Sequence, residues 1–348
     1  MHVPDGFLDA PTSVATGAVA AAGIAVALHK AREELDERAA PLAGLTAAFV
    51  FAGQMINFPV GMGTSGHLMG GALAAVLVGP WTAVLVLSVV LIIQSLLFAD
   101  GGLTALGTNM TLIGITTVAV GWLTTKALLA VLPKRPASVV PAAAFAALVS
   151  VPAAATVFVL LFSVGGQASL PFPTLLGTML GWHLLIGIGE AVITGLTVSA
   201  VVAVRPDLVF AARGLRPVLR LRQADGTLVD ASPSVAGAGP TGDRPGSRAP
   251  LRAVLVGGAV ATALIAGVLS FLASGSPDGL ERVAENEGFA DSAREHAFGG
   301  FALADYGEIG GIPVGLAGLL GVVITMIIGV AVFRLVRRRS RRDENVAA

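Results

Sequence analysis

Long apolar segments recur along the whole chain and restrict its fold more than any other feature of the sequence. A helix that crosses a bilayer requires about 20 mostly apolar residues. Charged residues make up only 13% of the 348, and the mean hydropathy is +0.83. We therefore predict an all-α polytopic membrane protein rather than a soluble domain. The predicted helices are Pro11–Leu28, Ala39–Ile56, His67–Gly79, Trp81–Phe98, Ala105–Leu132, Val139–Ser163, Thr174–Val204, Leu251–Ala273 and Pro313–Val336.

The segment His67–Gly79 is too short for an ordinary membrane-spanning helix. Either the bilayer is thinner there, or the segment is a partial helix packed inside the bundle. Basic residues collect in cytoplasmic loops. If all the predicted helices cross and the N-terminus lies outside, every one of the 22 lysines and arginines except Arg282 and Arg294 falls on or near the inner face. We therefore predict an outside N-terminus and a cytoplasmic C-terminus.

Composition divides the chain into three parts. Residues 1–205 are predicted to form a body of about seven helices. Residues 206–250 are basic and rich in Gly, Pro and Ser, so we predict a cytoplasmic linker without a core. Residues 251–348 are predicted to form a two-helix hairpin, whose outer loop from Ser274 to Ile312 carries eight acidic residues and two arginines.

The dipeptide Met1-His2 offers a metal ion three nitrogen donors without any fold. These are the α-amine, the amide of His2 and its imidazole, which together close fused five- and six-membered chelate rings. Such a set suits Ni(II), Cu(II) or, with added ligands, Co(II), and the chain has no cysteine to supply a thiolate. No cleavable signal is evident, because lysine and arginine are absent before Lys30. The alternative is that the dipeptide has no role.

His67 is the second candidate metal ligand. It lies in a glycine-rich stretch, where Thr64 and Ser65 are predicted to cap a helix that begins at His67. This position is at the outer boundary of the membrane, on the same side as Met1-His2, so His67 is a natural fourth nitrogen donor. The alternative is a histidine that is hydrogen-bonded between helices.

Other polar residues are expected within the bilayer. Asn57, Gln94 and Asn109, together with Thr64 and Ser65, are candidates for outer partners that orient the metal ligands. His183 and Glu190 are seven residues apart and share one helix face. They could serve translocation or proton transfer, or form a structural hydrogen-bond cluster, since a carboxyl group in lipid must be paired or protonated.

Six blocks of the sequence are distinctive: Met1–Leu8, Asn57–Val60, Gly63–His67, Gly79–Trp81, Gln94–Gly107 and Gly187–Ala191. They resemble the CbiM/NikM family, the substrate-binding membrane components of energy-coupling-factor cobalt and nickel importers. The resemblance covers about residues 1 to 205 and implies that the ion is bound by the amine of Met1, the amide and imidazole of His2, and His67. Pro277–Glu281 is similar to the PDGLE domain, which accompanies these proteins or is fused to them in the place of the partner CbiN or NikN.

The energy source is expected to lie in another chain. No lysine belongs to a G-x-x-x-x-G-K-[ST] motif, so the sequence has no Walker A loop. The resemblance implies a CbiO/NikO-like ABC ATPase, joined through a CbiQ/NikQ-like transmembrane coupling subunit. We expect the C-terminal hairpin to assist loading or coupling without providing a metal ligand, because His296 is its one histidine and lies in a loop rich in carboxylates.

The function indicated by these features is uptake of Co2+ or Ni2+ across a bacterial cell membrane, for cobalamin biosynthesis or for nickel enzymes. The ion is the transported ligand, with no permanent cofactor, no nucleic-acid partner and no enzymatic activity expected. The alternative is a self-sufficient secondary metal transporter or channel. An intramembrane metalloprotease would require His-Glu-x-x-His, and His183 is followed by Leu184. A vitamin-binding component is opposed by the low aromatic content of 5%.

Overall fold

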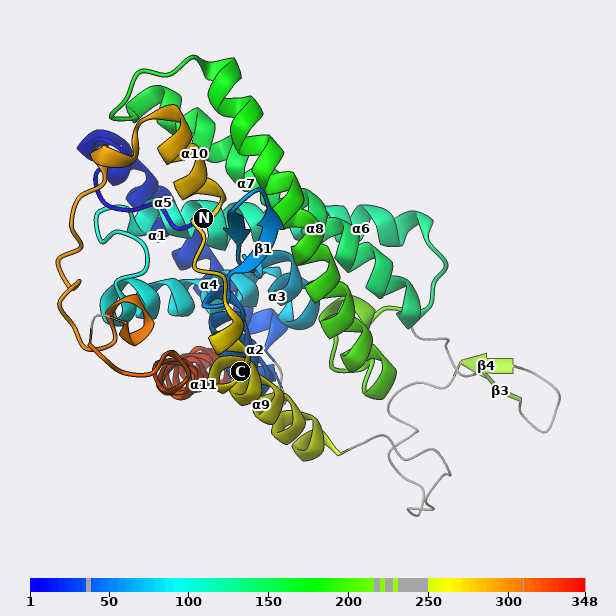
Figure 1. Ribbon diagram of the computed structural model, residues 1–348. Helices are drawn as coiled ribbons and strands as arrows, with labels where there is room; N and C mark the ends of the chain where they lie inside the picture. Colours follow the sequence, from blue (N-terminus) through cyan, green and yellow to red (C-terminus); the bar gives the residue numbers. More distant parts are fainter. Residues whose placement is uncertain (36–38, 216–219, 223–227, 231–249, 309, 348) are drawn as a thin grey trace.

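The structure is a computed structural model of the chain, and it describes residues 1–35, 39–215, 220–222, 228–230, 250–308 and 310–347. Within this part, seven helical segments are long and apolar enough to cross a membrane, which confirms the predicted multi-pass fold (Figure 1). The helices are α1 (Ala10–Glu34), α2 (Ala39–Gln54), α3 (Gly71–Val78), α4 (Pro80–Ile93), α5 (Leu106–Asn109), α6 (Thr117–Val131), α7 (Val139–Gly165), α8 (Phe172–Val204), α9 (Leu251–Gly267), α10 (Gly279–Glu287) and α11 (Val314–Ala347).

Two of the spans contain π-helical turns. One extends α4 over Gln94–Phe98, and the other joins α5 to α6 over Met110–Thr116. The predicted helix Ala105–Leu132 is therefore a single span with a widened middle. Such turns are frequent at functional sites, and both lie on the side of the bundle where the N-terminal segment packs.

The short third segment is a partial helix inside the bundle. All eight residues of α3 are buried, and Gly79 joins it directly to α4. The alternative of a locally thinned bilayer is therefore not needed. One expectation was wrong: the helix begins at Gly71, not at His67, and Thr64 and Ser65 do not cap it. Gly70 precedes it with φ +81°, a backbone conformation that favours glycine.

The residues before α3 form a small antiparallel hairpin, which the prediction of helices alone did not include. Its strands are β1 (Phe58–Gly61) and β2 (Thr64–Gly66). Gly61, Met62 and Gly63 all have positive φ and make the turn. A second hairpin, of β3 (Arg220–Arg222) and β4 (Leu228–Asp230), falls in the predicted linker; apart from these two strands, residues 216–249 of that linker lie outside the described residues.

Glycines allow α3 to cross α6 closely. A Cβ atom on Gly71 would lie 1.7 Å from Oγ1 of Thr117, and one on Gly121 would lie 2.6 Å from Cβ of Ala72. The two helices therefore touch along their backbones. This contact fixes the depth of α3 in the bundle. It thereby also fixes the position of the residues from His67 to Gly70, which directly precede the helix.

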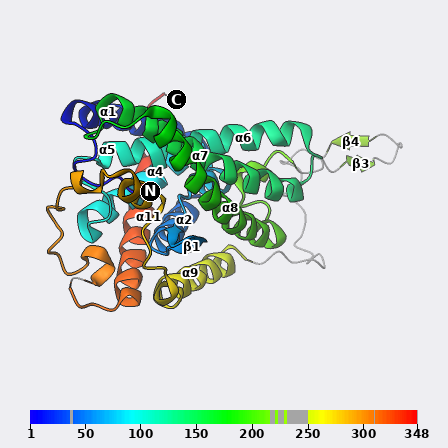
Figure 2. The ribbon, with the colours of Figure 1, turned by 45° about the horizontal axis from the view of Figure 1, so that its top comes forward.

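The C-terminal hairpin packs on the body at two places. Helices α9 and α11 lie against α2, on the side away from α6 (Figures 1 and 2). Between them, α10 reaches over to contact α8 and β2, beside the N-terminus (Figure 1). The N–H of Ser274 donates to the carbonyl of Asn57, and the N–H of Arg294 donates to that of Asp5. The acidic loop and Met1 therefore lie on the same side of the bundle.

The opposite side of the bundle is held by Glu34, at the end of α1. Its buried carboxylate accepts hydrogen bonds from the N–H groups of Trp81 and Thr82, at 3.2 and 2.7 Å, and from Oγ1 of Thr82 at 2.8 Å. The two N–H groups belong to the first turn of α4, where no acceptor within the helix is available to them. The end of α1 is thereby attached to the start of α4.

We predict that Gly71→Ala lowers the free energy of unfolding by about 1–3 kcal/mol, because the added methyl group overpacks the contact with Thr117. Gly177→Ala is the matched control. Gly177 lies in α8 with nothing within 4 Å of its Cβ position, so alanine is expected to be neutral or stabilising by about 0.4–1 kcal/mol. Thermal unfolding in detergent measures both. Equal melting temperatures for the two variants would contradict the close α3–α6 contact.

Candidate metal site

The N-terminal segment enters the bundle without regular secondary structure and is held by its main chain. Asn109 binds Val3 twice: its Oδ1 accepts from the N–H of Val3 at 2.8 Å, and its Nδ2 donates to the carbonyl at 3.0 Å. The same carbonyl accepts from the N–H of Gly102. Asp5 accepts from Leu103 and Thr104. The position of the α-amine is therefore set by contacts two to four residues away.

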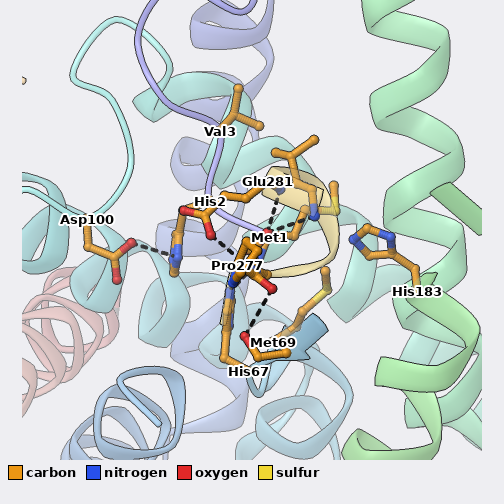
Figure 3. Close-up of polar contacts among 12 residues, drawn as sticks. Met1, His2, Val3, His67, Met69, Asp100, His183, Pro277 and Glu281 are labelled. Carbon is orange, nitrogen blue, oxygen red and sulfur yellow. Dashed lines mark hydrogen bonds and ion pairs between the residues drawn. The ribbon is translucent and has the colours of Figure 1, made fainter. Parts of the chain in front are cut away.

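The α-amine of Met1 meets two side chains in a buried position. It lies within hydrogen-bonding distance of Nε2 of His67 (Figure 3). It also lies 2.8 Å from Oδ2 of Asp278. The imidazoles of His2 and His67 are stacked, with ring centroids 4.8 Å apart. The three sequence-predicted ligands Met1, His2 and His67 are thus brought together.

The hydrogen bonds of His67 place its free lone pair toward Met1. Its Nδ1 lies 3.0 Å from the carbonyl oxygen of Leu68, which can only accept. Nδ1 therefore carries the proton in the neutral ring, and Nε2 has an unprotonated lone pair on the side of the amine. A metal-binding histidine usually has this arrangement, with its other nitrogen donating to a fixed acceptor.

His2 contacts a second carboxylate. Its Nδ1 lies 2.9 Å from Oδ1 of Asp100, whose Oδ2 accepts from the hydroxyl of Tyr306 at 2.6 Å. Nδ1 has one lone pair or one proton, so it must leave Asp100 to close a six-membered chelate ring with the amide nitrogen of His2. Burial raises the pKa of Asp100, but His2 and the hydroxyl of Tyr306 outweigh it and hold that pKa below its usual range.

Glu190 fixes the segment that follows His67. Its two carboxylate oxygens accept from the N–H groups of Met69 and Gly70, at 2.5 and 2.8 Å. On the other side, Nε2 of Gln54 donates to the carbonyl of Met69 at 2.8 Å. His183 instead hydrogen-bonds to the carbonyl of Met179 through Nδ1, so His183 and Glu190 have different partners. Figure 3 shows His183 apart from the contacts of Met1.

The remaining candidates lie around the site without contacting the ligands directly. Ser65 and Thr64 bind the C-terminal hairpin, through Ser276 and Arg282 respectively. Gln94 donates to the hydroxyl of Tyr306 at 3.3 Å. Asn57 lines a cavity of about 590 Å³ between the body and the hairpin. Other residues that line this cavity are His2, His67, Asp100, Asp278, His296, Asp305 and Tyr306.

Sequence reasoning missed Asp278 and gave Asp100 no role in the site. Asp278 entered only as part of the PDGLE resemblance, and the hairpin was expected to give no ligand because nitrogen donors alone were weighed. Among the described residues, no group of three or more His, Cys, Asp or Glu side chains could hold a metal ion. Met1-His2 adds two main-chain nitrogens, the α-amine and the amide of His2, to the side chains present here.

Comparison with known proteins identifies the family. Residues 2–208 match the CbiM family model, described as the cobalt uptake substrate-specific transmembrane region. The chain belongs to the CbiM family. Residues 252–338 match the PDGLE domain, so this member of the CbiM family also carries a C-terminal PDGLE domain.

Relatives and solved structures agree with this membership. A putative metal transport protein of Haloquadratum walsbyi is 37% identical over 60% of this chain and 94% of its own length. A putative fused nickel transport protein, NikMN, of Archaeoglobus fulgidus is 36% identical over 60% of this chain and 68% of its own. The crystal structure of a truncated transition metal transporter, 30% identical, superimposes with a TM-score of 0.53 over 58% of this chain and 99% of that one.

We predict that Glu190→Ala destabilises the protein and weakens metal binding, because two buried N–H groups beside His67 lose their acceptor. Each unsatisfied group costs about 1–3 kcal/mol. Glu190→Gln retains one acceptor oxygen and should give an intermediate loss. Glu33→Ala removes an exposed carboxylate and serves as the control. Thermal unfolding and metal titration test this order, and an alanine variant as stable as the wild type would refute the anchoring role.

Proposed function

We propose that this CbiM-family chain captures Co2+ or Ni2+ on the outer side of a bacterial cell membrane and passes it to an ATP-driven importer. The ion is the substrate. The donors are the amine of Met1, the amide and imidazole of His2, and Nε2 of His67. One observation supports this most directly: the amine and the lone pair of His67 meet beside the ring of His2, although Met1 and His67 are far apart in sequence.

The nature of the donors supports a late first-row metal. Amine, amide and imidazole nitrogens suit Ni(II) and Co(II), whereas Mg2+ and Ca2+ prefer oxygen. The outer location rests on the distribution of basic residues. The loop between α9 and α11 packs beside Met1, and Lys30 and Lys134 lie on the opposite side of the bundle. The relative from Archaeoglobus fulgidus is named a putative fused nickel transport protein, which is consistent with this substrate.

Energy coupling is proposed to require two partner subunits. A CbiQ/NikQ-like transmembrane subunit would contact the cytoplasmic side, and a CbiO/NikO-like ATPase would hydrolyse ATP. A self-sufficient transporter or channel is the second candidate. It needs ionisable groups along a path at mid-membrane, and Glu190 there is engaged with Met69 and Gly70. Metal uptake by cells that express this chain with and without the ATPase separates the two.

We predict that His2→Ala abolishes high-affinity binding of Co2+ and Ni2+, because the second chelate ring cannot close. His67→Ala should be nearly as severe. Either loss should exceed the about 10–100-fold effect of removing an outer partner of a ligand. His29→Ala, an exposed histidine at the far end of α1, is the matched control. Calorimetric titration of purified protein measures these affinities, and normal binding by His2→Ala would falsify the proposed site.

We also predict that any N-terminal extension blocks metal binding, because the nitrogen of Met1 then becomes an amide. The same affinity tag at the C-terminus should have no effect. Metal content per protein, measured by mass spectrometry after affinity purification, compares the two forms. Equal stoichiometry in both would exclude the α-amine as a ligand.

A further inference from the structure

The PDGLE domain brings a carboxylate into the proposed metal site. Oδ2 of Asp278 lies 2.8 Å from the nitrogen of Met1 and 3.7 Å from Nε2 of His67. Its side chain is only 10% exposed. Asp278 therefore adds an oxygen donor to the nitrogen donors of the body, from a domain that was expected to contribute none.

The orientation of this carboxylate is fixed by the helix that it begins. Oδ1 of Asp278 accepts from the N–H groups of Leu280 and Glu281, at 2.7 and 2.9 Å, and so caps α10. Oε2 of Glu281 accepts from the N–H of Asp278 at 2.8 Å, which completes a capping box. With Oδ1 committed to the helix, Oδ2 is left to face Met1 and His67.

The motif around Asp278 is also attached to the body. The carbonyl of Pro277 accepts from the N–H of Ser65 at 2.9 Å. Nη2 of Arg282 donates to the carbonyl of Gly63. Gly279 allows close approach to α8, since a Cβ there would lie 2.7 Å from Cδ1 of Ile186. The carboxylate is thus held from both sides, as a preorganised ligand requires.

We propose that Oδ2 of Asp278 is an oxygen ligand of the transported ion, so that the CbiM body and the PDGLE domain share one metal site. This inference rests on the proposed function of Met1, His2 and His67. Carboxylate oxygen is a suitable added ligand for Co2+, which accepts mixed nitrogen and oxygen donors. A divalent ion in a buried site also needs negative charge nearby. The deprotonated amide of His2 supplies one negative charge, and the carboxylate of Asp278 would supply the second.

The alternative role for Asp278 is an ion pair with the protonated amine of Met1, without contact to the metal. In that case the carboxylate stabilises the ammonium form, which competes with the metal for the nitrogen of Met1. Removing the charge would then leave metal affinity unchanged or improve it. The direction of the change in affinity therefore distinguishes a ligand from a counter-ion.

The decisive experiment is Co2+ titration of the full chain with Asp278→Asn. Asparagine is an equally good N-cap, so α10 should remain in place. We expect at least a ~10-fold weaker Kd, since a ligand should matter no less than an outer partner. X-ray absorption at the cobalt edge should lose one oxygen neighbour. Equal or tighter binding, or an unchanged absorption spectrum, would overturn the proposal.

Two further variants exclude indirect effects. Glu281→Ala breaks the capping box but keeps the carboxylate of Asp278, so it should weaken binding less than Asp278→Asn does. Asp291→Asn removes an exposed acid of the same loop and should change nothing. If Glu281→Ala weakens binding as much as Asp278→Asn, the effect acts through α10 and the ligand role fails. Failure of the proposed function is a different result: His2→Ala then binds Co2+ like the wild type.

Discussion

The carboxylate of Glu190 is the contact on which the arrangement of the site depends. Residues between β2 and α3 have no regular structure although they lie inside the bundle, and a membrane offers no water to satisfy their polar groups. Glu190 accepts from both Met69 and Gly70, and Gln54 satisfies the carbonyl of Met69. These bonds allow an unwound segment at this depth, and the unwound segment is what places His67 beneath the N-terminus.

Buried carboxylates serve the same purpose at several other points of the chain. Asp5 binds the turn before α5, Glu34 binds the start of α4, and Asp278 caps α10. Each accepts from main-chain N–H groups that no helix or sheet bond satisfies. Asp278 differs because its second oxygen reaches the α-amine of another segment. One side chain thereby contributes both to local helix formation and to the contact between the two domains.

Much of this arrangement could be predicted from the sequence, because hydropathy decides where helices cross a membrane. The spans and the convergence of Met1, His2 and His67 were both expected. The start of α3 was not, since it is set by Glu190, more than one hundred residues away. The contact of Asp278 with Met1 was not predicted for a similar reason. An aspartate after proline and before glycine is typical of a turn, and only tertiary contacts reveal its second partner.

Helix α1 has a consequence for communication across the membrane. It contains 25 residues, so it is about 37 Å long. At one end it follows the N-terminal segment that carries Met1, and at the other its Glu34 accepts hydrogen bonds from the first turn of α4. The helix is thus a stiff rod attached at both faces. Any axial shift of this helix at the first end would change the distance between Glu34 and α4 at the second, so the positions of the two attachments depend on each other.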